Sequence, residues 1–252
     1  MGDAGGEATR LTVPRFFVNR SAVTAESIRF EPDQAHQIRR VLRLRMGDRV
    51  VVCDGSGDEI IAVLQVEGKY VWARPLERRP GRGRPYRTVR LYQSALRGDR
   101  FAWLLQKATE VGVAGIVPLR YHFTQQADYG ARHGRYLAIL REAAEQCERS
   151  ILPDLATPML FADALLQCKP ERETCLLLDE QETEQSFNLA LRGSAGTVRL
   201  FVGPEGGITD DERTLAHRRG LSSVSLGRSI LRSETAGLVA VVLALGAAGD
   251  LG

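Results

Sequence analysis

The hydrophobic pattern of the 252-residue chain changes near Thr88, and this change constrains the fold more than any other feature. Before it, short runs rich in valine, isoleucine, phenylalanine and tryptophan are separated by glycine-containing turns, a pattern typical of strands. After it, short apolar runs alternate with stretches whose apolar residues recur at helical spacing. Such alternation predicts an α/β domain with a buried parallel sheet. The sequence therefore predicts a small β-rich domain followed by a larger α/β domain.

The N-terminal part is predicted to be a small β-barrel. Its expected strands are 15–19, 48–53, 58–66 and 69–74, and its expected helix is 32–44. Residues 78–85 contain two prolines, two glycines and no apolar residue, which indicates a linker. The expected organisation is a flexible tail at 1–13, a barrel at 14–77, a basic linker at 78–87 and an α/β domain at 88–252.

The α/β part is predicted from periodicity. Its expected strands are 89–93, 114–119, 175–179, 198–202 and 223–226, and its expected helices are 100–111, 132–149, 186–192, 210–219 and 234–247. Ligands of open parallel sheets bind at the carboxyl ends of the strands. The residues that follow each strand are therefore the first place to look for chemistry.

Charge is distributed unevenly along the chain. Residues 14–90 hold 16 basic and 9 acidic residues, whereas residues 91–252 hold 17 basic and 20 acidic. Two arginine-rich stretches, 39–45 and 74–90, carry most of the excess. Arginine makes planar, bidentate contacts to phosphate and stacks on bases. The basic third suggests a polyanion partner such as nucleic acid, although a solvated arginine-rich surface explains the same composition.

Several classes of protein and site are disfavoured. The four cysteines form no CxxC pair, and none of the four histidines has a second metal-type ligand at useful spacing, so we expect reduced thiols and no metal site. The longest nearly uncharged apolar run, 235–248, is shorter than the roughly 20 residues that cross a bilayer. The N-terminus lacks the basic and apolar regions of a signal peptide. We therefore expect a cytoplasmic protein without membrane contact.

A glycine-rich loop follows the expected strand 198–202. It reads Gly-Pro-Glu-Gly-Gly at 203–207, and Thr209 with Glu212 forms a capping box that starts the next helix. Glycines allow unusual backbone angles and close approach of the main chain to a ligand. The loop is neither GxGxxG nor a P-loop, because no Gly-Lys-Ser/Thr follows, and no GxSxG elbow occurs. A nucleotide-binding hydrolase and a serine hydrolase are thereby disfavoured.

A second loop of this kind, 226–236, follows the next strand. Leu226, Ile230 and Leu231 are apolar residues that can line a pocket for an aromatic ring, and Ser233 is the expected N-cap of the following helix. Two glycine-bearing loops from neighbouring strands, each leading into a helix, predict a cofactor site.

These motifs resemble the RsmE family of ribosomal RNA methyltransferases, within the SPOUT class, and the resemblance extends from Pro14 to Gly252. It is carried by Pro-Arg-Phe-Phe at 14–17, His36 followed by Val-Leu-Arg at 41–43, and the segments 106–113, 145–149, 203–207 and 226–236. The last two segments are specific in combination and in order.

The resemblance implies a PUA-like RNA-binding β-barrel followed by a SPOUT α/β domain with a trefoil knot. In the family, three loops of that knot bind S-adenosyl-L-methionine, and the matching residues here are Leu178, Val202, Gly203, Gly206, Gly207, Leu226, Gly227, Ser229, Ile230 and Leu231. The implied RNA contacts are Arg15, Arg39, Arg40, Arg43 and Arg149. The family also implies a homodimer through the apolar C-terminal helix, 235–245. One departure is Phe123, which stands where an arginine is usual, with Arg120 nearby as a substitute.

The implied reaction is methylation of uridine N3 in 16S (small-subunit) ribosomal RNA. Uracil N3 carries a proton, so an enzyme needs a base, a group that stabilises the anion over O2 and O4, or both. Arg232, Arg15 and Glu234 are the candidate catalytic residues, and Glu205 is a further carboxylate beside the loops. The glutamates also have ordinary structural explanations, because a carboxylate is favoured in the first turn of a helix.

Two alternatives remain open at this stage. One is another SPOUT enzyme, such as a transfer-RNA ribose 2′-O-methyltransferase, which the barrel-first order and the full-length match disfavour. The other is an RNA-binding ribosome-assembly factor that has lost catalysis and would not bind S-adenosylmethionine.

Overall fold

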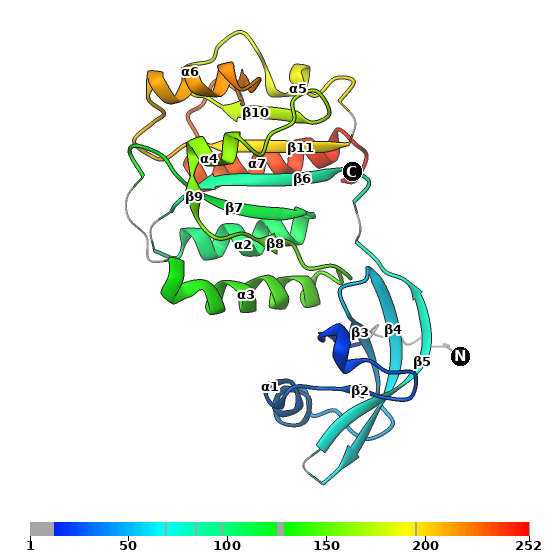
Figure 1. The fold of residues 1–252 in the computed structure, drawn as a ribbon. Coiled ribbons are helices and arrows are strands. Elements are labelled where there is room, and N and C mark those ends of the chain that lie inside the picture. The colour runs from blue at the N-terminus through cyan, green and yellow to red at the C-terminus, as the bar shows by residue number, and fades with distance from the viewer. Residues whose placement is uncertain are drawn as a thin grey trace, which may run out of the picture. The chain divides into compact units, whose positions relative to one another are not determined.

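The computed structural model describes residues 13–68, 70–83, 85–96, 98–124, 129–194 and 196–251. The predicted flexible tail therefore lies outside the described residues, apart from Val13. The chain divides into two compact units, Met1–Arg82 and Gly83–Gly252 (Figure 1). This division falls inside the predicted linker.

The described part of unit 1 is a curled five-stranded sheet with one α-helix and two shorter helical turns. Its elements are β1 (Arg15–Phe17), η1 (Arg20–Ala22), β2 (Ile28–Arg29), α1 (Pro32–His36), η2 (Gln37–Val41), β3 (Arg49–Cys53), β4 (Asp58–Glu67) and β5 (Tyr70–Pro80). The strand order is β1-β3-β4-β5-β2, in which β1 and β3 are parallel and the other pairs antiparallel. In the part of this unit that the structure describes, β1 and β2 are open edges, so the predicted barrel is a half-barrel.

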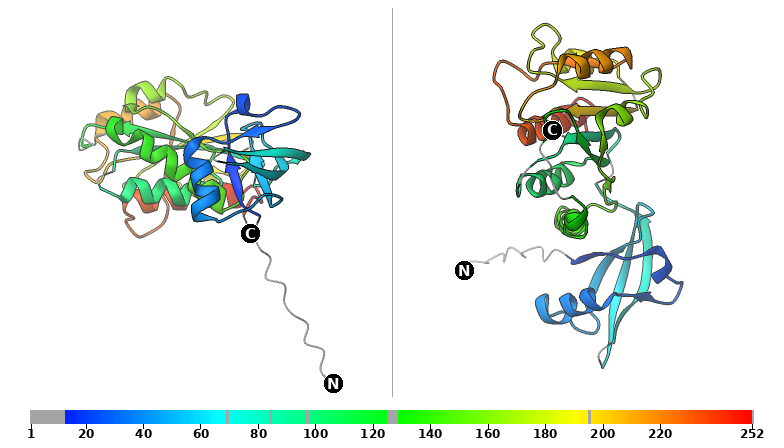
Figure 2. Two further views of the ribbon diagram at one scale, coloured as in Figure 1. Left: turned by 90° about the horizontal axis from the view of Figure 1, so that it is seen from below. Right: turned by 60° about the vertical axis from the view of Figure 1, so that its left-hand side comes forward.

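The core of unit 1 follows from alternation along its strands. Ile60, Ala62 and Leu64 of β4 are buried at every second position, as expected for a strand with one covered face. Ile38, which follows α1, joins the same core, and α1 lies along one side of the sheet (Figure 2). Gln34 fixes the helix there, because its Nε2 donates a hydrogen bond of 2.7 Å to the Phe17 carbonyl oxygen.

The start of the predicted linker belongs to the sheet instead. Strand β5 continues to Pro80 and pairs with the beginning of β4. Arg78 contacts Asp54 at 2.9 Å and Asp58 at 3.2 Å, while Arg79 contacts Glu59 at 2.9 Å. Carboxylates across the hairpin therefore neutralise part of the arginine-rich stretch 74–90, which composition alone suggested for polyanion binding.

Arg15 is also part of this sheet. Its side chain is buried, with Nη2 at 2.8 Å from Glu59 Oε1 and Nη1 at 3.1 Å from Cys53 Sγ. Burial would lower the pKa of Arg15, but its contacts with Cys53 and Glu59 outweigh burial and raise it. A buried ion pair of this kind is costly to break, because truncating one partner leaves the other charge without full compensation.

Unit 2 contains a parallel sheet in the order β12-β10-β11-β6-β7-β8, with β9 also paired to β7. Its strands are β6 (Thr88–Ser94), β7 (Gly115–Arg120), β8 (Asp154–Leu155), β9 (Met159–Leu160), β10 (Thr174–Leu178), β11 (Thr197–Val202) and β12 (Ser222–Val224). Its helices are α2 (Arg100–Val111), α3 (Tyr129–Gln146), α4 (Phe161–Leu165), α5 (Phe187–Ala190), α6 (Asp210–Arg218) and α7 (Ser233–Gly246). The predicted α/β domain with a parallel sheet is confirmed.

Helices cover both faces of this sheet. One layer joins strand residues such as Leu176 and Leu200 with α2, α3, α5 and α7, and the other joins Leu177 and Phe201 with α4 and α6. Successive strand residues therefore enter opposite cores, which explains why the runs are apolar without interruption. Figure 1 shows α7 passing along one face of β11 and β6.

Several local predictions needed correction. The short elements β2, β8, β9 and α4 were not predicted, since each has five residues or fewer. The N-cap of α7 is Arg232 rather than Ser233. No helix among the described residues has the length and hydropathy to cross a membrane. The trefoil knot stays a prediction.

We predict that Arg15→Met lowers the free energy of unfolding of unit 1 by about 3 kcal/mol, because Glu59 stays buried and loses a charged partner. Trp72 lies in β5 and Trp103 in α2. In a Trp103→Phe background, Trp72 fluorescence in urea therefore reports unit 1 alone. Arg29→Met, at an exposed position of β2, is the matched control. Equal midpoints for the two variants would contradict the assignment of Arg15 to the sheet.

Candidate active site

The three predicted loops surround one pocket in unit 2. They follow β10, β11 and β12, whose carboxyl ends lie at one edge of the sheet because the strands are parallel. The pocket has a volume of about 360 Å³, which is in the range of small-molecule sites. The central geometric prediction from the sequence, that these loops come together, is therefore confirmed.

Nine of the ten predicted cofactor residues line this pocket, and the tenth, Gly206, does not. The nine are Leu178, Val202, Gly203, Gly207, Leu226, Gly227, Ser229, Ile230 and Leu231. Lining residues that the sequence did not single out include Asp179, Glu180, Pro204, Ile208, Ser225 and Arg228. All of them stand within two positions of a predicted residue, so the loop motif located the site although it did not identify every residue that lines it.

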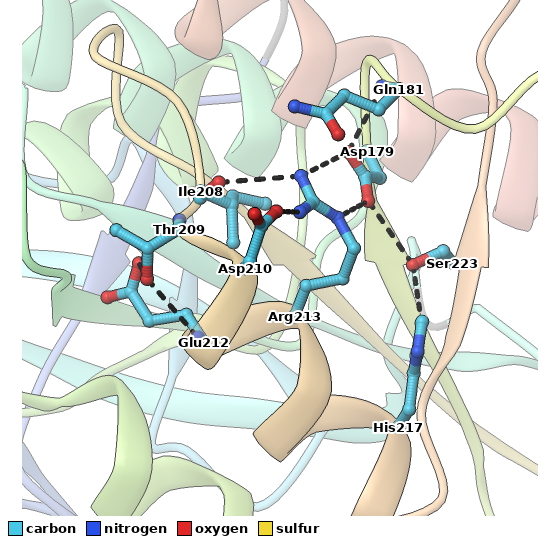
Figure 3. Close-up of polar contacts among 9 residues, drawn as sticks. All are labelled: Asp179, Gln181, Ile208, Thr209, Asp210, Glu212, Arg213, His217 and Ser223. Atoms are coloured by element: carbon cyan, nitrogen blue, oxygen red, sulfur yellow. Dashed lines mark hydrogen bonds and ion pairs between the residues drawn. The ribbon is translucent and has the colours of Figure 1, made fainter.

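A buried carboxylate ties the first two loops to strand β12 (Figure 3). Asp179 follows β10, and its backbone N–H donates to the Val224 carbonyl oxygen of β12 at 3.1 Å. Its Oδ2 accepts a hydrogen bond of 2.5 Å from Arg213 Nε, and the same guanidinium donates to the Ile208 carbonyl oxygen at 3.4 Å. The Ser223 hydroxyl donates to Asp179 Oδ2 at 3.4 Å, beside His217. Arg213 therefore joins the first loop to the second, and Asp179 joins both to β12.

The ionised state of Asp179 fits this role. Burial raises the pKa of the carboxyl group, but hydrogen bonds from Arg213 and from the Gln181 backbone amide outweigh burial and lower it below its ordinary value. Asp179 is therefore charged at neutral pH, and its charge stabilises the folded loops.

The glycine-rich loop needs small residues where it turns. A methyl group on Gly203 would lie 2.6 Å from Ile208 Cγ1, and Gly207 has a φ of +83°, which side chains rarely adopt. The Ser233 hydroxyl donates to the Gly203 carbonyl oxygen at 2.7 Å and so connects α7 to this loop. The predicted capping box of Thr209 and Glu212 is present at the start of α6.

Gly206 faces Phe123 and not the pocket. A methyl group on Gly206 would lie 2.9 Å from Phe123 Cβ, and the Phe123 ring is 49% exposed. The residue that departs from the family pattern therefore packs against the backbone of the cofactor loop.

One of the candidate catalytic residues, Arg232, lines this pocket, and a second, Glu234, stands beside a lining residue. Arg232 is exposed and makes no side-chain hydrogen bond or ion pair with any described residue. Glu234 is 7% exposed in the first turn of α7, next to the lining residue Ser233, and its Oε2 has no hydrogen-bond partner among the described residues. Glu205 is different, because it forms an ion pair with Arg100 of α2.

The roles predicted for Arg15 and Arg149 are not supported. Arg15 is buried in unit 1 against Glu59, so it is not available as a catalytic or RNA-contacting group. Arg149 is 4% exposed and donates to the Thr109 carbonyl oxygen at 2.9 Å, and burial lowers its pKa. Both guanidiniums hold protein structure, and we correct the prediction accordingly.

The other three predicted RNA contacts are on the surface of unit 1. Arg39 and Arg40 lie on η2, Arg43 follows with a φ of +54°, and all three are exposed. No hydrogen bond or ion pair engages their side chains within the described residues. The described residues contain no cluster of three potential metal ligands.

Comparison with known proteins agrees with this arrangement. Residues 83–245 match the family model of the RNA methyltransferase domain, and residues 30–76 match that of the RNA methyltransferase PUA domain. A PUA domain followed by an RNA methyltransferase domain is the class of protein that these matches define.

Full-length relatives narrow the class. The chain is 31% identical over 229 residues to ribosomal RNA small subunit methyltransferase E of Synechocystis sp., covering 90% of this chain and 75% of the relative. It is 28% identical over 231 residues to the protein of that name from Rickettsia conorii, covering 90% and 93%. The crystal structure of the Neisseria gonorrhoeae protein of that name bound to S-adenosyl methionine superposes with a TM-score of 0.82, at 28% identity, covering 91% of this chain and 95% of that one. The chain belongs to the ribosomal RNA small subunit methyltransferase E family, which confirms the resemblance found in its motifs.

We predict that Asp179→Asn lowers the free energy of unfolding of unit 2 by about 3 kcal/mol at pH 7. Because the folded pKa of Asp179 is depressed, its contribution is complete above the unfolded value of about 3.9 and is lost as the pH falls through the folded pKa. Urea unfolding from pH 7 to pH 3 measures this loss. Asp210→Asn is the control, since Asp210 contacts the same arginine but its side chain is 95% exposed. A difference between wild type and Asp179→Asn that does not shrink in acid would contradict the pairing.

Proposed function

We propose that this chain transfers a methyl group from S-adenosylmethionine to N3 of a uridine in 16S (small-subunit) ribosomal RNA. One observation carries the proposal: three strand-end loops with the expected residues surround a single pocket in a member of this methyltransferase family. The S-adenosyl methionine in the Neisseria gonorrhoeae relative supports the choice of cofactor. A cytoplasmic location, where ribosomal RNA is found, belongs to the same proposal.

The residues around the pocket fit this cofactor. Leu178, Val202, Leu226 and Leu231 offer apolar walls for an adenine ring, and the backbone of the glycine-rich loop offers polar groups at close range. Bound there, S-adenosylmethionine would supply a methyl group already activated by its sulfonium. The protein then has to position that methyl group and prepare the acceptor.

Preparing the acceptor means removing the proton from uracil N3 and stabilising the resulting anion. Arg232 is suited to stabilising the anion, because its guanidinium is exposed at the pocket and forms no hydrogen bond or ion pair with a described residue. Glu234 is the candidate for removing the N3 proton, since its buried Oε2 has no hydrogen-bond partner among the described residues. Glu205 is unsuited to proton transfer while it is paired with Arg100.

The proposal includes a homodimer through α7. Val242 of this helix is 37% exposed, and Val239 and Leu243 are only partly buried, so α7 leaves apolar surface uncovered in the single chain. A second copy packed against that surface would bury it. Sedimentation equilibrium distinguishes the dimer from a monomer.

Neither alternative gains support. For the first alternative, a transfer-RNA ribose methyltransferase, the relatives compared above are named as small-subunit ribosomal RNA methyltransferases, and nothing at the pocket favours a transfer-RNA ribose. A pure RNA-binding factor would give no heat on calorimetric titration with S-adenosylmethionine.

We predict that Arg232→Ala lowers the turnover number for methylation of small-subunit ribosomal RNA by about 10²–10³-fold, as expected for loss of one group that stabilises a developing anion. Binding of S-adenosylmethionine, measured by calorimetry, should change little. Transfer of labelled methyl followed by nucleoside analysis measures the activity and identifies the modified position. Arg218→Ala, at an exposed position of α6 away from the pocket, is the control. Full activity of Arg232→Ala would remove Arg232 from the mechanism.

A further inference from the structure

The carboxyl end of β6 holds a polar side chain where the core pattern calls for an apolar one. Val89, Leu91 and Gln93 occupy alternate positions of this strand, and all three are fully buried. The first two belong to the apolar layer that includes α7, and Gln93 pairs in register with Val202 of β11. Burying an amide is costly unless the amide is hydrogen-bonded. The partner of Gln93 inside this layer therefore indicates what the residue does.

That partner is Ser233, in the first turn of α7. Gln93 Nε2 donates a hydrogen bond of 2.8 Å to Ser233 Oγ. The Ser233 hydroxyl in turn donates to the Gly203 carbonyl oxygen at 2.7 Å. A hydroxyl that accepts from an amide still has its own proton to donate, so both bonds run in one direction. The Gln93–Ser233–Gly203 chain of hydrogen bonds therefore connects β6, through α7, to the glycine-rich loop.

The amide of Gln93 is packed directly against the backbone of α7. A methyl group on Gly237 would collide with Gln93 Oε1. The same Oε1 is buried and has no hydrogen-bond partner among the described residues. An unpaired buried acceptor destabilises a fold, and an apolar side chain of similar shape removes that penalty. Stability alone does not explain a glutamine here, which points to a role in the neighbouring pocket.

This chain of hydrogen bonds supplies a connection that the Asp179–Arg213 pair does not make. That pair joins the first two loops to β12. Within the part of the chain that the structure describes, it makes no hydrogen bond to the third loop, 225–231, or to α7. The third loop leads into α7, where Ser233 and the second loop meet. The pocket is therefore fastened at two places, and Gln93 stands behind the second.

We propose that Gln93 is a positioning residue for methyl transfer, which holds the Ser233 hydroxyl on the Gly203 carbonyl and thereby orders the glycine-rich loop before the cofactor binds. The proposal rests on the proposed function, since it concerns the pocket assigned to S-adenosylmethionine. Ser233 and Gly203 line that pocket and Gln93 does not, so Gln93 acts only through them. A loop that is already ordered loses less conformational entropy on binding, which raises the affinity for the ligand.

Hydrogen exchange without cofactor tests the effect on the loop by itself. Gln93→Met keeps the approximate size of the side chain and removes its donor. The Gly207 amide, which donates to the Pro204 carbonyl oxygen inside the loop at 3.0 Å, should exchange about tenfold faster in this variant. Amides at 179–182, beside the Asp179–Arg213 pair, should exchange as in the wild type. Unchanged exchange at Gly207 would overturn the proposal.

Steady-state kinetics separate positioning from a general loss of structure. Gln93→Met should raise KM for S-adenosylmethionine about tenfold and leave kcat within about twofold, because the bound cofactor restores the loop. KM for the RNA should not change. Thr109→Val is the matched control, since it removes a buried hydroxyl that donates to the Leu105 carbonyl oxygen at 2.7 Å in α2, outside the pocket lining. A lower kcat at an unchanged KM for the cofactor would assign Gln93 a purely structural role and overturn the proposal.

A double variant tests the path through Ser233. If Gln93 acts only through that hydroxyl, Ser233→Ala alone and Ser233→Ala combined with Gln93→Met should weaken cofactor binding equally in calorimetry. Additive effects of the two substitutions, or wild-type affinity of Gln93→Met, would contradict the proposal. A wild-type chain that binds no S-adenosylmethionine would refute the proposed function instead. The exchange of Gly207, which is measured without cofactor, still decides in that case whether Gln93 orders the loop.

Discussion

The pocket of unit 2 depends on one buried carboxylate. Parallel strands bring three loops to the same edge of the sheet, but nothing in a sheet fixes the distances between loops. Asp179 does so here, because its side chain is 5% exposed and needs the Arg213 guanidinium to remain charged. That guanidinium also holds Ile208, while Ser223 reaches the same carboxylate from β12. The Asp179–Arg213 ion pair therefore holds the first two loops and strand β12 together at one side of the pocket.

Arginine has two different uses in this protein, and the presence of a partner within reach separates them. Arg15 and Arg149 are buried and hold backbone or carboxylate oxygens inside their own units. Arg39, Arg40 and Arg232 are exposed and have no partner among the described residues, which leaves them free to contact a ligand. Net charge and motif position do not distinguish these groups. The two groups are distinguished by whether the folded chain places a carboxylate or carbonyl oxygen within hydrogen-bonding distance of the guanidinium.

Much of the architecture was predictable because it follows local patterns. Helical spacing gave the bounds of α2, and the capping box of Thr209 and Glu212 marked the start of α6. The loops of the site were predictable from glycine placement after strands. The Asp179–Arg213 pair and the Arg15–Glu59 pair were not, since their partners are 34 and 44 residues apart. Local sequence carries no signal for such pairing, and for that reason the sequence placed Arg15 among the candidate catalytic and RNA-contacting residues.

Hydrogen exchange of backbone amides with and without S-adenosylmethionine tests the central claim most directly. If the three loops form one cofactor pocket, amides at 179–182, 203–209 and 225–231 should slow together on addition of the cofactor, while unit 1 stays unchanged. Protection of a single loop, or no protection at saturating cofactor, would contradict the account.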